Sequence, residues 1–259
     1  MKSSKTAVLA CAGSLLLAAT AQGQEVRVIA SGAVTHALAA VVPAFEREAL
    51  RKVVIVPGTS IGTGPDAIAT RLQSGEAVDV IITTQTALEA LFEQGRIVPG
   101  SGADLVRSGI GMAVRAGAPK PDISSIEALT HTLRQAKSVA VSASLSGLYL
   151  SSELFPKLGV AEEVAKKIRQ VAGEPVAAVV ARGEAEIGFQ QIRELLPVPG
   201  IAYVGPLPVE AQRVTVFSAG AARVSKDSDM ARSLIRFLAT RAAAGDFIKH
   251  GLDPARLPQ

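Results

Sequence analysis

The feature that most constrains this chain is a regular alternation of short β-branched runs with longer amphipathic segments. Apolar residues recur at helical spacing between the runs, as along residues 36–51, where Leu38, Val41 and Phe45 share one face. The predicted order, in sequence, is strand 25–30, helix 36–51, strand 52–56, helix 66–74, strand 79–82 and helix 87–94. This βαβαβα order predicts a mainly parallel sheet with helices on both faces.

A second α/β unit is predicted after residue 110. Its strands are expected at 110–115, 138–141 and 186–189, and its helices at 125–136, 148–158, 161–168 and 175–182. Pro175 fits the first turn of its helix, because a proline at that position loses no helical hydrogen bond. A strand at 213–218 and helices at 229–240 and 242–249 are expected to return to the first unit.

Composition excludes several classes of protein. Aromatic residues make up 3% of the 259 residues and tryptophan is absent, which argues against platforms that stack sugars or bases. The net charge is +4, and without Lys2 and Lys5 the chain has 25 basic against 23 acidic residues. No basic run exceeds Lys166 and Lys167, so we expect no nucleic-acid partner.

The first 23 residues read as a secretory signal peptide. Lys2 and Lys5 precede an apolar stretch that ends in the small residues Ala19, Thr20 and Ala21. We expect export to the periplasm and no membrane insertion after cleavage. The single cysteine is Cys11. The sequence around it faintly resembles a lipoprotein signal, so a lipid anchor is the alternative to simple cleavage. Removal of Cys11 would exclude disulfides and zinc–thiolate sites from the mature chain.

Three loops rich in glycine and hydroxyl residues follow predicted strands. Glycine allows close backbone approach, and the N-terminus of a helix favours an anion. Ordinary helix capping uses the same residue types, but three such loops together predict a small-anion site. The second loop lacks the lysine of a phosphate-binding loop, which argues against nucleotide hydrolysis. The expected ligand-binding residues are Ser31, Gly32 and Ala33; Thr59, Ser60, Gly62 and Thr63; and Ser144, Ser146 and Gly147.

Four further side chains are candidates for the site. Gln190 and Gln191 end a strand, and an amide can recognise a carboxylate or a hydroxyl group, although solvated amides at a helix start are equally consistent. His36 follows the first loop and Glu174 precedes Pro175, so either could serve as an acid or base. The alternative for both is capping or surface exposure. No His, Asp or Glu spacing predicts a metal site.

The chain resembles the periplasmic molybdate-binding proteins of ABC transporters. The resemblance rests on residues 30–35 (ASGAVT), 80–82 (VII), 154–159 (LFPKLG) and 185–188 (AEIG), and it extends over residues 25–252. It implies a type II periplasmic-binding fold, with two α/β lobes of mainly parallel sheets flanked by helices and two hinge crossovers. The expected lobes are residues 24–109 with 205–259, and residues 110–204.

The resemblance also places a ligand site. The family holds its oxyanion with serines, backbone amides and a tyrosine hydroxyl. Here Ala33 takes the first serine position, the amide positions fall near Ser146 and Val176, and Gln191 takes the tyrosine position. These differences favour an organic di- or tricarboxylate over molybdate.

Two functions are compatible with these residues. The favoured one is a monomeric extracytoplasmic solute-binding protein that delivers a small anion to an ABC permease, with no cofactor. The alternative rests on residues 110–124 and 188–191, which resemble a divergent branch of the family that includes periplasmic aconitate isomerase. That enzyme interconverts cis- and trans-aconitate by a 1,3-proton shift without a cofactor.

The alternative would need a base, a proton donor and a cation near the ligand. His36 and Glu174 are the predicted acid–base candidates. Arg71, Arg115 and Arg182 are the arginines considered for the cation. A purely structural exported protein is a third interpretation, and the three anion-type loops disfavour it.

Overall fold

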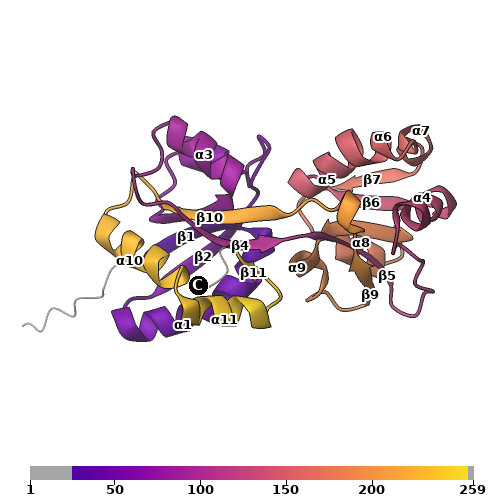
Figure 1. The fold of residues 1–259 in the computed structure, drawn as a ribbon. Helices are drawn as coiled ribbons and strands as arrows, with labels where there is room; N and C mark the ends of the chain where they lie inside the picture. Colours follow the sequence, from indigo (N-terminus) through magenta and orange to yellow (C-terminus); the bar gives the residue numbers. More distant parts are fainter. Residues whose placement is uncertain (1–24, 256–259) are drawn as a thin grey trace, which may run out of the picture.

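The computed structural model describes residues 25–255, so the expected signal peptide lies outside the described residues. Two sheets lie side by side (Figure 1). The strand order of the first sheet is β11 (Asp253–Pro254), β4 (Ala103–Ser108), β10 (Thr215–Ala221), β3 (Val80–Thr84), β1 (Val26–Ser31) and β2 (Val53–Gly58). The order of the second is β7 (Ile168–Val171), β6 (Val139–Ser142), β8 (Ile187–Gln191), β5 (Ile110–Arg115) and β9 (Ile201–Pro206).

Most strands of each sheet run in one direction, as expected, but each sheet is mixed because it also contains strands of the opposite direction. β1 pairs in parallel with β2 and β3, but β10 runs antiparallel to β3 and β4. In the second sheet β6 is parallel to β7 and β8, whereas β5 is antiparallel to β8 and β9. The reversal arises because strands that arrive from the other sheet enter in the opposite direction.

Helices cover both faces of each sheet, as the apolar periodicity predicts. Around the first sheet lie α1 (Gly32–Ala49), α2 (Ile68–Gln73), α3 (Gln85–Glu93), α10 (Ser228–Leu238) and α11 (Arg241–Lys249). Around the second lie α4 (Ile126–Gln135), α5 (Leu145–Tyr149), α6 (Phe155–Lys157), α7 (Ala161–Ala165), α8 (Val176–Ala181) and α9 (Ile192–Leu195). Among residues 25–255 no helix is long and apolar enough to cross a membrane.

Several helices begin or end at other residues than the sequence predicts. α1 begins at Gly32, four residues before the predicted start, so the first loop is itself the N-terminus of the helix. The helix predicted over 161–168 ends at Ala165, and Ile168 begins β7. Pro175 is the N-cap of α8 and lies outside its first turn. The helix expected over 148–158 begins at Leu145 and contains a π-helical turn, Leu150–Leu154.

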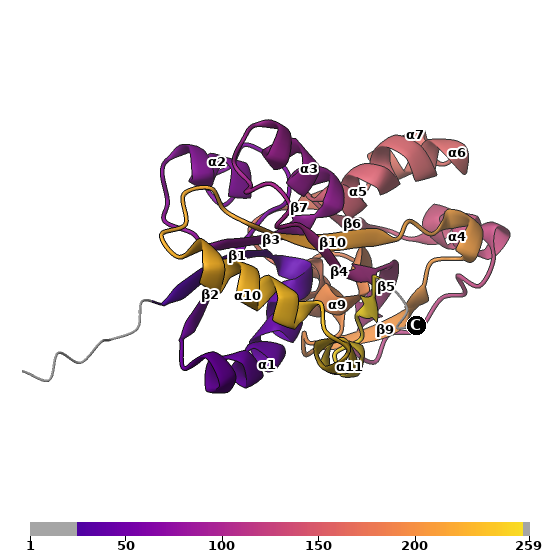
Figure 2. The same ribbon diagram turned by 60° about the vertical axis from the view of Figure 1, so that its left-hand side comes forward.

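The chain passes between the sheets twice, from β4 to β5 and from β9 to β10 (Figures 1 and 2). Gln212, in the second crossing, binds the backbone of Ile110 at the end of the first. The Ile110 N–H donates to Gln212 Oε1 at 2.7 Å, and Gln212 Nε2 donates to the Ile110 carbonyl at 3.0 Å. One amide side chain therefore joins the two crossings.

Replacing Gln212 with alanine should lower the free energy of unfolding by about 2 kcal/mol, because two backbone groups lose their partners. Urea titration followed by circular dichroism measures this change. Gln135→Ala, at an exposed position of α4, is the control and should change stability by less than about 0.5 kcal/mol. Equal stabilities of the two variants would contradict a role for the Gln212 contact.

Candidate functional site

The carboxyl ends of three parallel strands, β2, β1 and β3, meet at one edge of the first sheet. Ser31 ends β1, Ser60 follows β2, and Thr83 and Thr84 end β3. The hydroxyls of Ser60 and Thr83 are buried and have no hydrogen-bond partner among the described residues. Buried hydroxyls normally have hydrogen-bond partners. The unpaired hydroxyls at this edge are therefore free to bond to a polar ligand.

The N-terminus of α1 lies at the same edge. Ser31 is the N-cap, but its side chain makes no capping bond, and the first turn has no acidic residue. Thr35 Oγ1 donates to the Ser31 carbonyl at 3.0 Å. The positive end of an 18-residue helix is thus not neutralised by its own sequence.

A carboxylate from the second sheet reaches this helix end. A Cβ built on Gly32 would lie 2.8 Å from Oε1 of Glu194, which belongs to α9 after β8. Glu194 is half-buried, and α9 packs against α1. The carboxyl ends of β1 and β8 therefore face each other here, and Glu194 lies between them.

Burial raises the pKa of the Glu194 carboxyl from 4.5 to about 7, and a hydrogen bond with the Gln190 side chain opposes this rise in part. Gln190 Oε1 accepts from the Val176 N–H at 2.8 Å. With its oxygen held in this way, the Gln190 amide nitrogen is left for Glu194. The geometry supplies a titratable carboxyl near neutral pH, oriented by a buried amide.

This pKa predicts a pH dependence of stability. Between pH 4.5 and 7 the folded protein holds a proton on Glu194 that the unfolded chain has released, so stability falls as pH rises. The full difference is on the order of 3 kcal/mol as an upper limit. Urea unfolding of wild type and Glu194→Gln at pH 4.5 and 8 measures it. The wild type should lose more stability than the variant, and equal losses would contradict the raised pKa.

Two of the groups predicted to contact the ligand are instead hydrogen-bonded to other groups of the protein. The Val176 N–H, expected to face the ligand, already donates to Gln190. Gln191 lies at the crossings, with its amide 3.0 Å from Thr215 Oγ1. In the orientation that satisfies both ends of this amide, its oxygen accepts from Thr215 Oγ1 and its nitrogen donates to the Gly109 carbonyl at 3.0 Å.

The third loop presents three serine hydroxyls that bond to one another. Oγ of Ser142 lies 2.7 Å from that of Ser144 and 3.0 Å from that of Ser146. Ser144 is partly exposed, so this cluster can offer a donor to a ligand. Gly147 has a packing role, since a Cβ there would overlap the Ser142 carbonyl oxygen.

The two ends of the second loop are hydrogen-bonded to each other. Thr59 N–H donates to the Asp66 carbonyl, and its own carbonyl accepts from Ile68, both at 3.0 Å. Gly62 has φ +105°, which requires glycine, and Thr63 is exposed. Ser60 is the residue of this loop with an unpartnered buried hydroxyl.

The two predicted acid–base residues lie apart from Glu194. His36 is exposed, one turn further along α1 than Gly32, and its ring centroid is 5.9 Å from that of His250. Glu174 is exposed and paired with Arg182 at 2.8 Å, and this partner lowers its pKa. A carboxylate with a lowered pKa is a weak base, so Glu174 does not enter our proposal.

The three arginines considered for the cation are also engaged or exposed. Arg71 pairs with Glu76 and donates to the Pro57 carbonyl. Arg182 pairs with Glu184 as well as Glu174, and Arg115 is exposed at the end of β5. The arginine adjacent to Glu194 in sequence is Arg193, and the sequence analysis predicted neither residue for the site. A signal was present in the sequence, because both residues lie within three positions of the glutamine pair.

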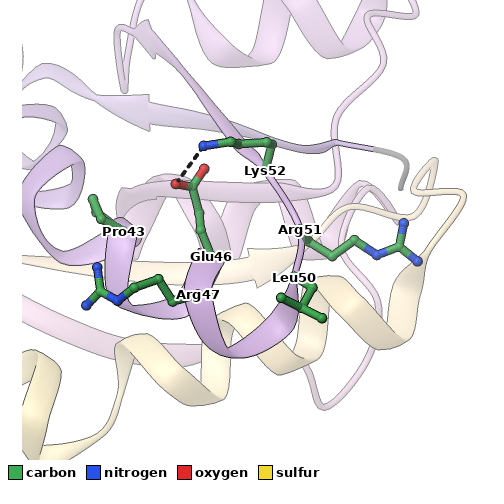
Figure 3. Close-up of a pocket in the computed structure, with 6 residues that line it drawn as sticks. All are labelled: Pro43, Glu46, Arg47, Leu50, Arg51 and Lys52. Atoms are coloured by element: carbon green, nitrogen blue, oxygen red, sulfur yellow. Dashed lines mark hydrogen bonds and ion pairs between the residues drawn. The ribbon is translucent and has the colours of Figure 1, made fainter. Parts of the chain in front are cut away.

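A surface hollow lies at the other end of α1 (Figure 3). Its lining includes a pair between Glu46 and Lys52, whose charged atoms are 3.5 Å apart, and Glu46 also accepts from the Val53 N–H at 2.8 Å. These interactions close the turn from α1 to β2. The hollow is lined by Pro43, Glu46, Arg47, Leu50, Arg51 and Lys52.

Comparisons with known proteins agree with this architecture. Residues 26–253 match the family described as "Bacterial extracellular solute-binding protein". A Pseudomonas sp. protein named aconitate isomerase is 43% identical over 247 residues, covering 93% of this chain and 94% of the relative.

Solved structures share the fold at low sequence identity. The periplasmic molybdate-binding protein of Azotobacter vinelandii aligns with a TM-score of 0.69 and 19% identity, covering 91% of this chain and 100% of that one. The sulfate-binding protein SubI of Mycobacterium tuberculosis H37Rv gives a TM-score of 0.71 and 16% identity, covering 90% and 87%. The expected resemblance to molybdate-binding proteins and the two-sheet fold are confirmed.

Proposed function

Because the chain belongs to the bacterial extracellular solute-binding protein family, and because a relative named aconitate isomerase is 43% identical across it, we propose that it isomerises aconitate. The observation that carries this proposal is Glu194, a carboxyl with a pKa of about 7 that lies against Gly32 at the N-terminus of α1. A protein that only binds an anion does not need a proton carrier at that position.

The reaction moves a double bond across a nearly symmetrical skeleton. Aconitate has a methylene and a vinylic carbon on either side of its central carbon. Removal of a proton from the methylene carbon moves the double bond to that side of the central carbon. Addition of a proton to the former vinylic carbon then gives aconitate again, and the new double bond can be cis or trans. One proton leaves and one enters, so the reaction needs no oxidant or reductant.

Glu194 fits the requirement for a group that both takes and returns a proton. With a pKa of about 7, similar amounts of the acid and its conjugate base are present at neutral pH. Gln190 would hold the carboxyl in place, and the free N–H groups at the start of α1 would attract substrate carboxylates. The hydroxyls of Ser60, Thr83 and Ser144 are the neutral donors proposed to orient the rest of the molecule.

Proton NMR of cis-aconitate in D₂O, with and without the mature protein, tests the proposal. We expect trans-aconitate signals to grow at a rate proportional to protein concentration, with deuterium entering the methylene position. Heat-denatured protein is the control for spontaneous isomerisation. An unchanged spectrum at a concentration that saturates binding would refute the isomerase proposal.

The second candidate is the function the sequence alone favours, a binding protein for a small carboxylate. Its support is the family itself and the hydroxyl-lined strand ends. Calorimetric titration with aconitate, citrate, molybdate and sulfate distinguishes it, because a pure binder would show a ligand and no turnover.

We also propose the cellular context that the sequence predicts. Residues 1–23 would direct export, the mature chain would work in the periplasm as a monomer, and a permease would be a partner only if the protein is a binder. The expected lobes are residues 24–109 with 205–259, and residues 110–204. We propose to move the second boundary to the end of β9, at Pro206, because the strands change sheet after β4 and after β9. Mass spectrometry of the exported protein would give the cleavage site.

A further inference from the structure

Arg193 has an unusual position for a cation in this protein. It belongs to α9, which connects β8 and β9 of the second sheet, yet its guanidinium lies against the C-terminal segment of the first α/β unit. A Cβ built on Gly251 would be 2.7 Å from Nη1 and 3.3 Å from Cζ of Arg193. The neighbouring residue, His250, faces His36 of α1. Arg193 therefore spans the same contact between the two units that Glu194 makes at Gly32.

Arg193 is half-buried and has no hydrogen-bonded or ion-pair partner among the described residues. Burial lowers its pKa, and no acidic neighbour raises it again. Other arginines show the usual arrangement: Arg182 pairs with two glutamates, and Arg213 pairs with Glu153. A guanidinium that is partly shielded from water and has no carboxylate beside it is available to bind an anion.

Glu194 is not that partner, although it is adjacent in sequence. The pKa of Glu194 responds to burial and to Gln190, and no charge effect from Arg193 contributes to it. The two side chains thus leave α9 in different directions, one toward Gly32 and the other toward Gly251. A ligand with several carboxylates could contact both.

We propose that Arg193 binds one carboxylate of the ligand and so selects organic polycarboxylates over tetrahedral oxyanions. This inference rests on the proposed function, because it assumes that the ligand lies beside Glu194. A planar guanidinium matches the two oxygens of a carboxylate, an arrangement that a lysine ammonium cannot reproduce. Anchoring one carboxylate there would hold the carbon chain toward Glu194 in a fixed orientation.

Calorimetric titration of cis-aconitate into the mature protein tests this assignment. Arg193→Gln should raise Kd by about 10- to 100-fold, and Arg193→Lys by less, because charge is kept and the planar fork is lost. The free energy of unfolding of Arg193→Gln should stay within about 0.5 kcal/mol of wild type, since only van der Waals contact with Gly251 is lost and no hydrogen bond or ion pair is broken. The matched control is Arg115→Gln, an exposed arginine, for which Kd should stay unchanged.

The possible outcomes separate this inference from the proposed function. An unchanged Kd in Arg193→Gln overturns the role of Arg193, even if the wild type is an isomerase. A wild type that binds cis-aconitate without turnover refutes the isomerase, and the raised Kd of Arg193→Gln would still support the carboxylate contact. A wild type that binds none of cis-aconitate, trans-aconitate and citrate overturns both.

Discussion

Replacing Glu194 with glutamine should lower the rate of cis-aconitate isomerisation by about 10²- to 10⁴-fold, the range typical for loss of a general acid–base group. Glutamine has nearly the same shape but cannot carry a proton between two carbons. Binding should be preserved or tightened, because a carboxylate that competes for the start of α1 is removed. NMR rates together with calorimetric Kd values measure both effects.

The control for this substitution is Glu174→Gln, which removes an exposed carboxylate paired with Arg182. Its turnover should match that of wild type. The wild-type kcat should also rise as the pH passes through about 7, because only the ionised Glu194 accepts a proton. Turnover that survives in Glu194→Gln would show that another group transfers the proton.

The second large effect is expected for Gly147→Ala. A Cβ at this position would overlap the Ser142 carbonyl oxygen, which is backbone and cannot rotate away. α5 would have to move off the end of β6, and we expect a loss of at least about 3 kcal/mol in the free energy of unfolding, at the upper end for overpacked sites. Urea titration measures the loss.

Gly245→Ala is the matched control for that change. Gly245 lies inside α11, and a Cβ there would meet nothing within 4 Å. Alanine should stabilise the helix by about 0.5–1 kcal/mol. If Gly147→Ala were as stable as wild type but lost its ligand, the glycine would be a binding residue, as the loop sequence indicates, and the packing explanation would fail.

Sequence reasoning reached the fold because its signals are local. β5 is found at the predicted residues, since a run of apolar residues bounded by a turn is buried on both faces. β7 is missing from the predicted strands because its residues, IRQV, include two exposed polar side chains and begin only three residues after the end of α7. Strands at the edge of a sheet have weak patterns of this kind.

The site was harder to predict, because its chemistry depends on contacts between distant segments. The pKa of Glu194 depends on burial near Gly32, which lies more than 150 residues earlier in the chain. Gln191 occupies the predicted ligand position in sequence, but its amide is taken up at the crossings by Thr215. The serine-rich loops were recognisable because helix starts and strand ends have local sequence signals.

The place of β10 in the first sheet has a consequence for how the chain acquires its structure. β10 lies between β3 and β4, yet it is made only after every strand of the second sheet. During synthesis or translocation the second sheet, whose strands are contiguous in sequence, can therefore form first. The edges of β3 and β4 that face β10 have no hydrogen-bonded neighbour until residues 215–221 have been made. In pulse-labelling hydrogen exchange, amides of β6 and β8 should gain protection before those of β3.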